Sequence, residues 1–383
     1  MPPSPFSYRS NMTDNKDLQS AFSAHSSPDK QADCTLTVDQ LRAFGIDLLT
    51  SAGASEQEAI GVVDELVSAD AAGHPSHGIM RLTQYVPFLR TGFIQAGASL
   101  AVIRESPQVD VFDGQFGFGQ ILMRELREIA YGKASQHGSY TAFGRNFCHV
   151  GRLGSYVEDA VQNGFLAMMM VNVNGAARVA PYGTDQPRLG TNPICIGMPY
   201  RDRAIMVDTT TCVTAEGKLR IAIQNGRRVP DGQIVDTDGR PTNDPADFYS
   251  DPTGAILPMG GDVAYKGSGL AIMVEMMCGI LSGAGFGRHD VATGTNGIWF
   301  HLVELDHVID KKQYAEQTET FVEYIKQSRL ADDTVEVMLP GETEYRRAES
   351  AQADGIRIAG GTWHQLLMLA SEFGVQVPDH GPS

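Results

Sequence analysis

The sequence has few cysteines and fewer basic than acidic residues. Its five cysteines are scattered over 383 residues and include no C-x-x-C pair, so neither a disulfide framework nor a structural zinc site is indicated. Thirty Lys and Arg residues stand against 46 Asp and Glu residues, which gives a formal net charge of −16. Such a charge repels nucleic-acid phosphates and anionic lipid surfaces. We therefore expect a cytoplasmic protein that binds neither nucleic acid nor membranes.

The sequence also contains no hydrophobic run typical of a membrane span or a secretory signal. The most apolar long segment, residues 267–285, includes Glu275 and five glycines, and it is better explained as a buried helix. The first 33 residues are rich in Ser, Pro, Asn and Gln and lack the apolar segment of a signal peptide. We interpret residues 1–33 as a disordered tail.

Three common catalytic motifs are absent. A Rossmann dinucleotide site requires G-x-G-x-x-G between a strand and a helix, and the glycines at 114, 117 and 119 have a different spacing. Residues 261–267 lack the final Gly-Lys-Ser/Thr of a P-loop, which counts against phosphoryl transfer. The absence of G-x-S-x-G counts against an α/β-hydrolase. These absences exclude several enzyme classes and identify none.

The sequence does contain a regular alternation of helix and strand patterns. Forty-two per cent of the residues are hydrophobic, which is enough for a sizeable core and two or three domains. Helices are predicted over 121–136 and 153–163, and strands over 140–143 and 165–173. Residues 227–265, dense in Pro, Asp and Gly, predict a long loop. The alternation favours an α/β or α+β fold with helices packed on a sheet.

Capping signals place further helices. Ser55 and Glu58 form a capping box, which predicts the start of a helix. Another helix is expected over residues 213–224, before Asn225 and Gly226. Thr362 is expected to cap the last helix of the chain.

A glycine-flanked connection over residues 144–156 joins a predicted strand to a predicted helix and carries His149. Connections of this kind expose side chains to ligands, and histidine exchanges protons near neutral pH. His149 is therefore the first candidate for a catalytic group, and we interpret the neighbouring Cys148 as a packing residue. The alternative is an ordinary histidine whose hydrogen bonds are satisfied within a loop.

A second candidate group begins at Ser76, which is expected to start a helix. On that helix His77, Arg81 and Tyr85 recur every four residues along one face. A proton-transfer group, a guanidinium that can bind a carboxylate and a phenol on one face predict a site. The alternative interpretation makes Ser76 a helix cap and the other three residues a solvated face.

A metal site is a further possibility, because His74, His77 and His149 could supply three imidazoles. No H-E-x-x-H or neighbouring carboxylate pattern accompanies them. We therefore expect no metal, and a metal hydrolase is kept as the alternative from a different enzyme class.

Several short motifs occur in order along most of the chain, from about residue 35 to residue 375. These motifs are residues 73–82, 146–156, 188–193, 207–210, 215–218, 257–261, 266–270 and 362–363. Together they resemble the malate/L-lactate dehydrogenase-like family of NAD(P)-dependent oxidoreductases, which is distinct from the Rossmann-type lactate and malate dehydrogenases. The resemblance also accounts for the missing dinucleotide fingerprint.

The resemblance implies a non-Rossmann sheet domain that binds NAD or NADP, inserted in a helical or mixed domain built from both chain ends. On this basis residues 113–303 bind the cofactor, and residues 34–112 and 304–383 form the domain for substrate binding and dimerisation. A homodimer is implied. Family members transfer hydride between nicotinamide and the carbon beside the carboxylate of a small 2-hydroxy or 2-oxo acid.

The resemblance also assigns the proton chemistry. His149 would be the acid/base, and His77, supported by Ser76, either assists or takes that role. One branch of the family reduces cyclic imines such as piperideine-2-carboxylate with a Ser/His/Asp relay, which maps to Ser76, His77 and Asp208. A cyclic-imine reductase is the alternative on the same scaffold, because both reactions need a carboxylate clamp and a proton donor.

The remaining expected roles concern substrate and cofactor. Arg81 suits two-pronged carboxylate binding, and Tyr85 would orient the substrate. The residues expected to contact the cofactor are Asn172, Asn174, Thr191, Asn192, Asp208, Thr209 and Lys266. Residues 260–269 depart from the pattern of many relatives by an insertion. The preference between NADH and NADPH therefore stays open.

Overall fold

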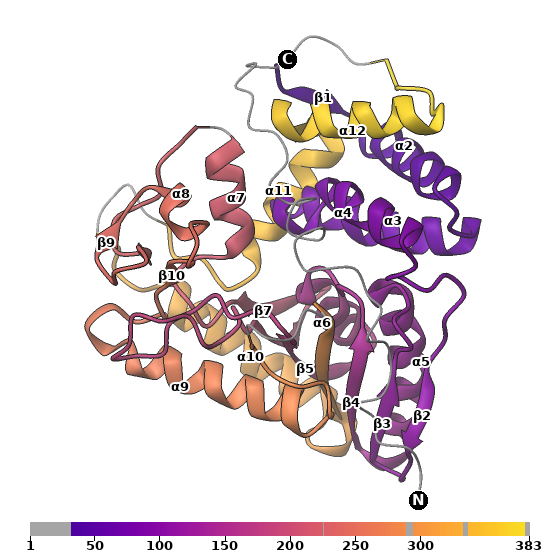
Figure 1. Cartoon of the computed structure of the whole chain (residues 1–383). Helices are drawn as coiled ribbons and strands as arrows, with labels where there is room; N and C mark the ends of the chain where they lie inside the picture. The colour runs from indigo at the N-terminus through magenta and orange to yellow at the C-terminus, as the bar shows by residue number, and fades with distance from the viewer. Residues whose placement is uncertain (1–31, 225, 289–293, 332–335, 380–383) are drawn as a thin grey trace, which may run out of the picture. The chain divides into compact units, whose positions relative to one another are not determined.

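The computed structural model describes residues 32–224, 226–288, 294–331 and 336–379. The predicted disordered tail over residues 1–33 lies outside these ranges except for its last two residues. The described chain combines a seven-stranded sheet, a body of helices from both chain ends and a lobe with a three-stranded sheet (Figure 1). The predicted α/β (α+β) fold class is therefore confirmed.

The large sheet has the order β2-β3-β4-β11-β5-β6-β7. Its strands are β2 (Ala101–Arg104), β3 (Val109–Asp113), β4 (Ser139–Phe147), β11 (Asn296–Glu304), β5 (Phe165–Val173), β6 (Ile194–Tyr200) and β7 (Arg203–Thr209). Within this sheet β3 and β4 are parallel, and the other neighbours are antiparallel. A Rossmann sheet is mostly parallel, so this sheet is of another kind.

Helices cover both faces of the large sheet. Helices α5 (Gly119–His137) and α6 (Leu153–Gln162) share a buried core with one face. The other face carries η4, a π-helix at Glu275–Ile280 that continues α9 (Tyr265–Val274). Helix α10 (Lys311–Lys326) lies against β6, where the Tyr314 hydroxyl donates to the Pro199 carbonyl over 2.7 Å.

Both chain ends form the helical body. Its elements are β1 (Cys34–Leu36), α2 (Val38–Ser51), α3 (Glu56–Ala71), α4 (Leu82–Arg90), α11 (Glu342–Asp354), β12 (Ile356–Ile358) and α12 (Gly360–Phe373). Strands β1 and β12 pair antiparallel, and the two ends share one hydrophobic core. In Figure 1 the indigo N-terminal helices and the yellow C-terminal helices lie side by side. The predicted capping box of Ser55 and Glu58 is confirmed at the start of α3.

The predicted loop over residues 227–265 is wrong in part, because short elements organise much of it. The lobe contains α7 (Glu216–Gln224), β8 (Ile234–Val235), β9 (Pro241–Thr242), α8 (Pro245–Phe248) and β10 (Ala255–Ile256). Strands of two residues are too short to produce a periodic pattern in a sequence. Helix α7 also begins three residues later than expected.

Two predicted helix starts are also wrong. Ser76 does not begin a long helix: two 3-10 turns, η1 (Pro75–His77) and η2 (Ile79–Arg81), precede α4. Gly78 is extended between these turns and interrupts the helical path. Ala359 rather than Thr362 is the cap residue of α12, and Thr362 is buried inside the helix.

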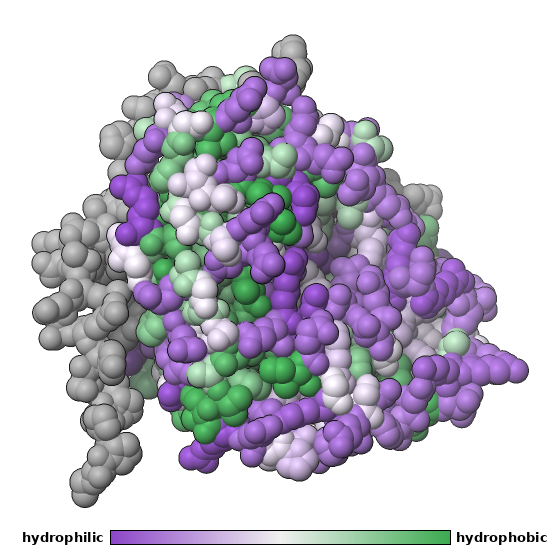
Figure 2. Space-filling view, turned by 90° about the vertical axis from the view of Figure 1, so that its right-hand side faces the viewer, coloured by the Kyte–Doolittle hydropathy of each residue, from purple (hydrophilic) through white to green (hydrophobic). Residues whose placement is uncertain are grey.

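The segment over residues 267–285 is not the fully buried helix that its composition predicts. Met273 is 50% exposed and Ile280 is 58% exposed, so α9 and η4 present an apolar face outward. No helix in the described parts of the chain is long and apolar enough to cross a membrane. On the face that carries α5 and β2, hydrophobic side chains form separate areas among hydrophilic ones (Figure 2).

Candidate active site

The large sheet brings the ends of several strands together. Phe147 at the end of β4 is opposite Asn296 at the start of β11, which is itself opposite Val173 at the end of β5. Asp208 near the end of β7 is opposite Cys195 near the start of β6. Predicted site residues on these strands, and on the loops next to them, therefore lie at the same end of the sheet.

His149 lies on the connection between β4 and α6, as predicted, and close packing fixes this loop. The Val150 N–H donates to Asn296 Oδ1 over 3.0 Å. Gly119, at the start of α5, lies so close to the loop that a Cβ there would be 2.2 Å from the Cys148 carbonyl oxygen. A residue with a side chain at position 119 would displace the loop that carries His149.

Tyr85 holds the His149 ring. The Tyr85 hydroxyl is 2.6 Å from His149 Nδ1, and Gln120 Nε2 donates to the same hydroxyl over 2.8 Å. Tyr85 is 2% exposed, and burial raises its pKa to about 12, so the phenol stays protonated. Because Nδ1 is occupied by Tyr85, Nε2 is the His149 atom left for proton exchange with a ligand.

His77 lies against His149. The two ring centroids are 5.4 Å apart and the rings are nearly parallel, at 20°. His77 Nδ1 is 3.0 Å from Ser76 Oγ. Burial, followed by the charge of Arg81, lowers the pKa of His77 to about 3 and that of His149 well below its usual value. Both rings are therefore neutral near neutral pH in this structure.

Arg81 reaches the same group from η2. Its Nε donates to the Ser76 carbonyl over 2.6 Å, and its Nη1 donates to Gln84 Oε1 over 2.8 Å. The predicted face of His77, Arg81 and Tyr85 thus comes together near His149, although it is built from two 3-10 turns and a helix. The alternative of a solvated face is wrong, because Tyr85 is buried and all three residues have burial-shifted pKa values.

Asp208 lies apart from this group. Its carboxylate accepts the Gly154 N–H over 2.8 Å and is 3.8 Å from Arg152 Nε. Burial raises the pKa of Asp208, although Arg152, Gly154 and His74 oppose this. Among the described residues, the hydrogen bonds of Asp208 do not reach His77. The structure therefore joins Ser76 to His77 and does not join Asp208 to that pair.

Two of the expected cofactor residues are held by Glu275. This carboxylate is 6% exposed and accepts from Asn172 Nδ2 over 2.8 Å, Asn192 Nδ2 over 3.0 Å and the Gly190 N–H over 2.9 Å. The Gly287 N–H is a further donor at 3.3 Å. Glu275 thus connects β5, the loop before β6 and the π-helix at one point.

The other expected cofactor residues lie on separate strands, loops and a helix, and no single one of the described residues binds them together as Glu275 binds Asn172 and Asn192. Asn174 follows β5, where its N–H donates to the Thr295 carbonyl, and the Thr191 carbonyl accepts the Thr211 N–H. Thr209 is exposed at the end of β7. Lys266 is exposed in the first turn of α9.

The structure also shows the surroundings of Cys148 and of the three histidines considered as metal ligands. Cys148 is buried, its Sγ donates to the Phe116 carbonyl, and burial raises its pKa to about 12, as expected of a packing residue. His74 Nε2 lies 3.5 Å from Glu344 and not in the His77–His149 stack. No group of three or more His, Cys, Asp or Glu side chains in the described ranges is arranged to hold a metal ion.

Sequence reasoning missed several residues of the site. Five such residues contact predicted residues or shift their pKa values, namely Gln120, Glu216, Arg220, Glu275 and Asn296, whose Nδ2 donates to the Asn172 carbonyl. Gln120 follows the glycine-rich turn, but a lone glutamine carries no recognisable pattern. Glu275 gave the clearest signal, because a carboxylate in a strongly apolar segment needs partners when it is buried.

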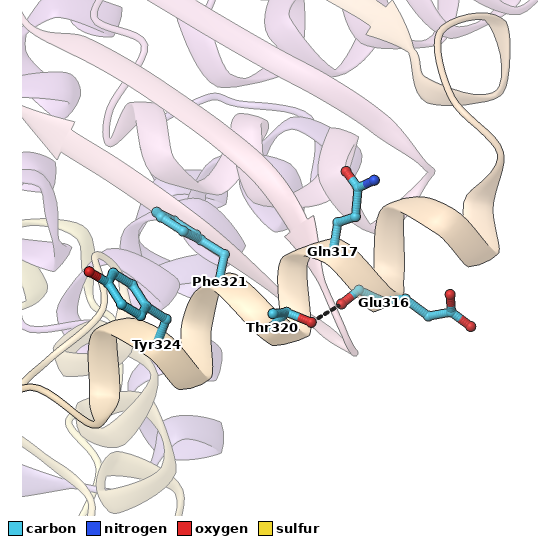
Figure 3. A pocket seen from close by; sticks show the side chains of 5 residues that line it. All are labelled: Glu316, Gln317, Thr320, Phe321 and Tyr324. Atoms are coloured by element: carbon cyan, nitrogen blue, oxygen red, sulfur yellow. Dashed lines mark hydrogen bonds between the residues drawn. The ribbon is translucent and has the colours of Figure 1, made fainter.

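Figure 3 shows a depression on the surface of α10, lined by residues of that helix alone. The Phe321 and Tyr324 side chains project from α10, and Thr320 Oγ1 donates to the Glu316 carbonyl over 2.9 Å. None of these residues belongs to the predicted site, and we assign the depression no catalytic role.

Comparison with known proteins identifies the family. Residues 36–367 match the family model described as malate/L-lactate dehydrogenase. The chain belongs to the malate/L-lactate dehydrogenase family. It is 32% identical to hydroxycarboxylate dehydrogenase B of Escherichia coli, with 88% of this chain and 93% of the relative covered. It is 33% identical to L-sulfolactate dehydrogenase of Methanocaldococcus jannaschii, with 88% and 96% covered.

A solved structure shows the same architecture. Malate dehydrogenase from Pyrococcus horikoshii OT3 aligns with a TM-score of 0.80 at 29% identity, covering 90% of this chain and 97% of that one. The predicted family and the predicted class of enzyme, a 2-hydroxyacid dehydrogenase, are confirmed. Family membership does not favour the metal hydrolase.

Proposed function

We propose that the protein is an NAD(P)-dependent oxidoreductase that transfers hydride between nicotinamide and the carbon beside the carboxylate of a small 2-hydroxy or 2-oxo acid. The observation that carries this proposal is the group of His149, Tyr85, His77 and Arg81. It offers a proton-exchanging imidazole of fixed orientation beside a guanidinium suited to a carboxylate. The names of the relatives point to the same class of substrate.

The chain's own residues account for the proton step. We propose that Tyr85 accepts Nδ1–H of His149, which leaves the Nε2 lone pair to take the hydroxyl proton of a 2-hydroxy acid. Arg81 would hold the substrate carboxylate and thereby fix the reacting carbon. Because the charge of Arg81 helps to keep His149 neutral, a bound carboxylate would offset that charge and raise the imidazole pKa as the proton arrives.

We propose that His77 supports His149 in proton transfer and is not itself the main acid/base. Its Nδ1 is engaged by Ser76, and its ring supports His149 by stacking. A Ser76-His77-Asp208 relay is not favoured, because the contacts of Asp208 go to Gly154 and Arg152. The relatives' names likewise favour a hydroxy or oxo acid over a cyclic imine.

The residues at the end of the sheet fit a nicotinamide cofactor. The Oδ1 atoms of Asn172 and Asn192 are buried and have no hydrogen-bond partner among the described residues, so each suits a donor such as the carboxamide of nicotinamide. We propose that the site is completed by Asn174, Thr191, Asp208 and Thr209, with Lys266 near a cofactor phosphate. When bound, the nicotinamide supplies or accepts the hydride.

We further propose a homodimer in the cytoplasm. The outward side chains of α9 and η4 are apolar, namely Leu270, Ile272, Met273, Met276 and Ile280, and a second copy of the chain would bury them. The five cysteines are free and buried, which supports a reducing compartment. We propose that the helical body built from both chain ends (34–112 and 304–383 in the sequence prediction) serves substrate binding and that the large sheet (113–303) serves the cofactor. Because β2 and β3 belong to this sheet, its domain begins before residue 113, and the proposed dimer contact through α9 and η4 lies in the cofactor part rather than in the chain ends.

Nicotinamide absorbance tests the proposal. The full chain should oxidise NADH or NADPH when a small 2-oxo acid is added, and should reduce the oxidised cofactor with the hydroxy acid. H149A should lower kcat by about 10²- to 10⁴-fold, the usual contribution of a general acid/base, with little change in cofactor affinity. A folded protein that turns over no 2-oxo acid with either cofactor would refute the proposal.

A further inference from the structure

The chain breaks its helical path between the two 3-10 turns that carry His77 and Arg81. Gly78 is extended at this break, with φ −89° and ψ −157°. In a continuous helix from Ser76, the Ser76 carbonyl would accept the N–H four positions further on. It accepts Arg81 Nε instead, over 2.6 Å. The break therefore leaves a backbone carbonyl free to hold the Arg81 guanidinium.

A carboxylate at the end of α3 stabilises this break. Asp70 Oδ2 accepts the Ile79 N–H over 2.6 Å, and the Asp70 carbonyl accepts the Gly73 N–H over 2.9 Å. The Ile79 N–H is the first of η2, so that turn offers it no acceptor. Because Ile79 is 1% exposed, loss of the Asp70 side chain would leave a buried N–H without a partner.

Gly78 packs directly on the same carboxyl group. A Cβ at Gly78 would be 2.0 Å from Asp70 Oδ1. The φ of Gly78 is one that residues with side chains also adopt. Contact with the Asp70 carboxyl, and not backbone strain, therefore leaves no room for a side chain at this position.

The surroundings of Asp70 do not favour a carboxylate for stability alone. Burial raises the pKa of the Asp70 carboxyl to about 7, and the Ile79 N–H opposes this shift. Among the described residues, no cation contributes to lowering this pKa. A carboxyl in such surroundings costs the fold free energy when it ionises, so its contact with the break is the interaction that accounts for its place.

We propose that Asp70 is a positioning residue for substrate binding: through the Ile79 N–H it holds the break at Gly78, and the break sets Arg81 for the substrate carboxylate. This inference rests on the function proposed above and adds to it a residue that does not itself touch the substrate. Without the Asp70 acceptor, residues 76–81 would relax. Displacement of a substrate-binding group by about 1 Å can lower the rate by about a hundredfold.

Substitutions of Asp70 test the role of the acceptor in the full chain with its preferred nicotinamide and 2-oxo acid. In D70A we expect kcat/KM for the 2-oxo acid to fall by about ten- to a hundredfold, and cofactor affinity to change by less than about twofold. D70N keeps an oxygen that can accept the Ile79 N–H and should recover most of the loss.

E58A and E58Q are the matched controls for D70A and D70N. Glu58 is a buried carboxylate of the same helix, and it accepts the Gly97 N–H over 2.7 Å. Both control variants should leave kcat/KM unchanged under conditions in which they are folded.

G78A tests the same contact from the side of the break. A methyl group at Gly78 would clash with the Asp70 carboxyl, so kcat/KM should fall as it does in D70A. In D70A/G78A the clash is removed, and the fall should be no larger than that of the worse single variant, whereas independent effects would multiply. If D70A does not fold, the loss in G78A and its absence in D70N still test the contact.

The outcomes separate this inference from the proposed function. A value of kcat/KM in D70A or G78A equal to that of wild type, or a loss in D70A that D70N does not recover, would overturn the positioning role and keep the dehydrogenase. A loss that E58A shares, or an equal fall in cofactor affinity, would also overturn it and make Asp70 a residue of general stability. A wild type that turns over no 2-oxo acid would overturn the proposed function, and this inference with it.

Discussion

At the residue scale, the chemistry of His149 depends on what surrounds it. Burial and the positive charges of Arg81 and Arg220 favour its neutral form, and Tyr85 occupies one of its two nitrogens. A neutral imidazole with one nitrogen fixed is suited to take a proton through the other. In the proposed mechanism, a substrate carboxylate beside Arg81 would offset the charge of that guanidinium and raise the pKa of His149.

Replacing Tyr85 by Phe tests whether the Tyr85 hydroxyl fixes the orientation of the His149 ring. Y85F keeps the ring and removes the hydroxyl that contacts His149 and Gln120. We expect kcat to fall by about tenfold or more while cofactor affinity changes little. Y140F is the control, because the buried Tyr140 hydroxyl donates to Asp110 away from the site. Equal kcat values in the two variants would make Tyr85 a structural residue.

The stacked histidine His77 predicts how stability varies with pH. Its pKa is about 3 in the fold against 6.5 in the unfolded chain, so the unfolded chain binds a proton that the folded protein excludes. The stability contributed by keeping His77 neutral is therefore fully present above pH 6.5 and is lost as the pH falls toward 3. In H77Q the slope of unfolding free energy should be smaller by up to about 1.4 kcal/mol per pH unit.

Denaturant titrations at several pH values between neutral and about pH 5 measure this slope. H137Q is the control, because His137 is an exposed residue at the end of α5 and its replacement also removes one imidazole from the unfolded chain. If H77Q and wild type lose stability in parallel as the pH falls, His77 is not held neutral by the fold.

Which site residues could be predicted depended on local pattern. His149 was predictable because glycines flank it between a strand and a helix, and Arg81 because it recurs with His77 and Tyr85. The contacts of Asp208 were not predictable, since its partners Gly154 and Arg152 are more than 50 positions away and become neighbours only because the start of α6 packs against β7. Arg220 was not predictable as part of this region, because α7 approaches the turn that carries Ser76 only in the folded chain.

At the element scale, the π-helix η4 places Glu275 where two loops and a strand meet. Replacing the carboxylate by an amide in E275Q puts a donor opposite N–H groups that already donate. We expect cofactor affinity to fall about tenfold or more and stability to fall by about 1 to 3 kcal/mol. Cofactor titration and denaturant unfolding measure the two effects.

E58Q controls for the loss of a partly buried carboxylate elsewhere. Glu58 caps α3 and accepts the Gly97 N–H over 2.7 Å, so its loss should lower stability and leave cofactor affinity unchanged. Equal cofactor affinity in E275Q and wild type would show that Glu275 only stabilises the fold.

Elements were predictable where their signals were local and long. The strand over 165–173 and the capping box of α3 are confirmed because a short apolar run and a helix cap are both signals carried by a few neighbouring residues. The prediction of one helix beginning at Ser76 is wrong because apolar residues spaced by three and four also fit two 3-10 turns followed by a helix. The prediction that α9 is fully buried is wrong because composition does not distinguish a helix in the core from one with an outward apolar face.

At the scale of the whole molecule, pairing of the chain ends could not be seen in the sequence. Strands β1 and β12, each three residues long, lie more than 300 positions apart, and only the resemblance to a family implied that both ends form one body. The exposed apolar face of α9 could not be seen in the sequence either. Such a face is usually buried by a partner, and we propose that a second copy of the chain buries it.

A charge introduced on that face tests the homodimer. M273K places a lysine at a half-exposed position of α9 and should weaken dimerisation by about tenfold or more, because burying an unpaired charge is unfavourable. Sedimentation over a range of protein concentrations measures the change. V308K is the control, since Val308 is 69% exposed outside α9. A monomeric wild type, or equal effects of both variants, would contradict the proposed interface.

Hydride transfer is the central claim, and an isotope label follows it most directly. The full chain is incubated with a 2-oxo acid and reduced nicotinamide that carries deuterium at the transferable position, and the product is examined by mass spectrometry. We predict one deuterium on the carbon beside the carboxylate, and its near absence in H149A over the same time. Product without deuterium, or no product with any 2-oxo acid, would contradict the claim.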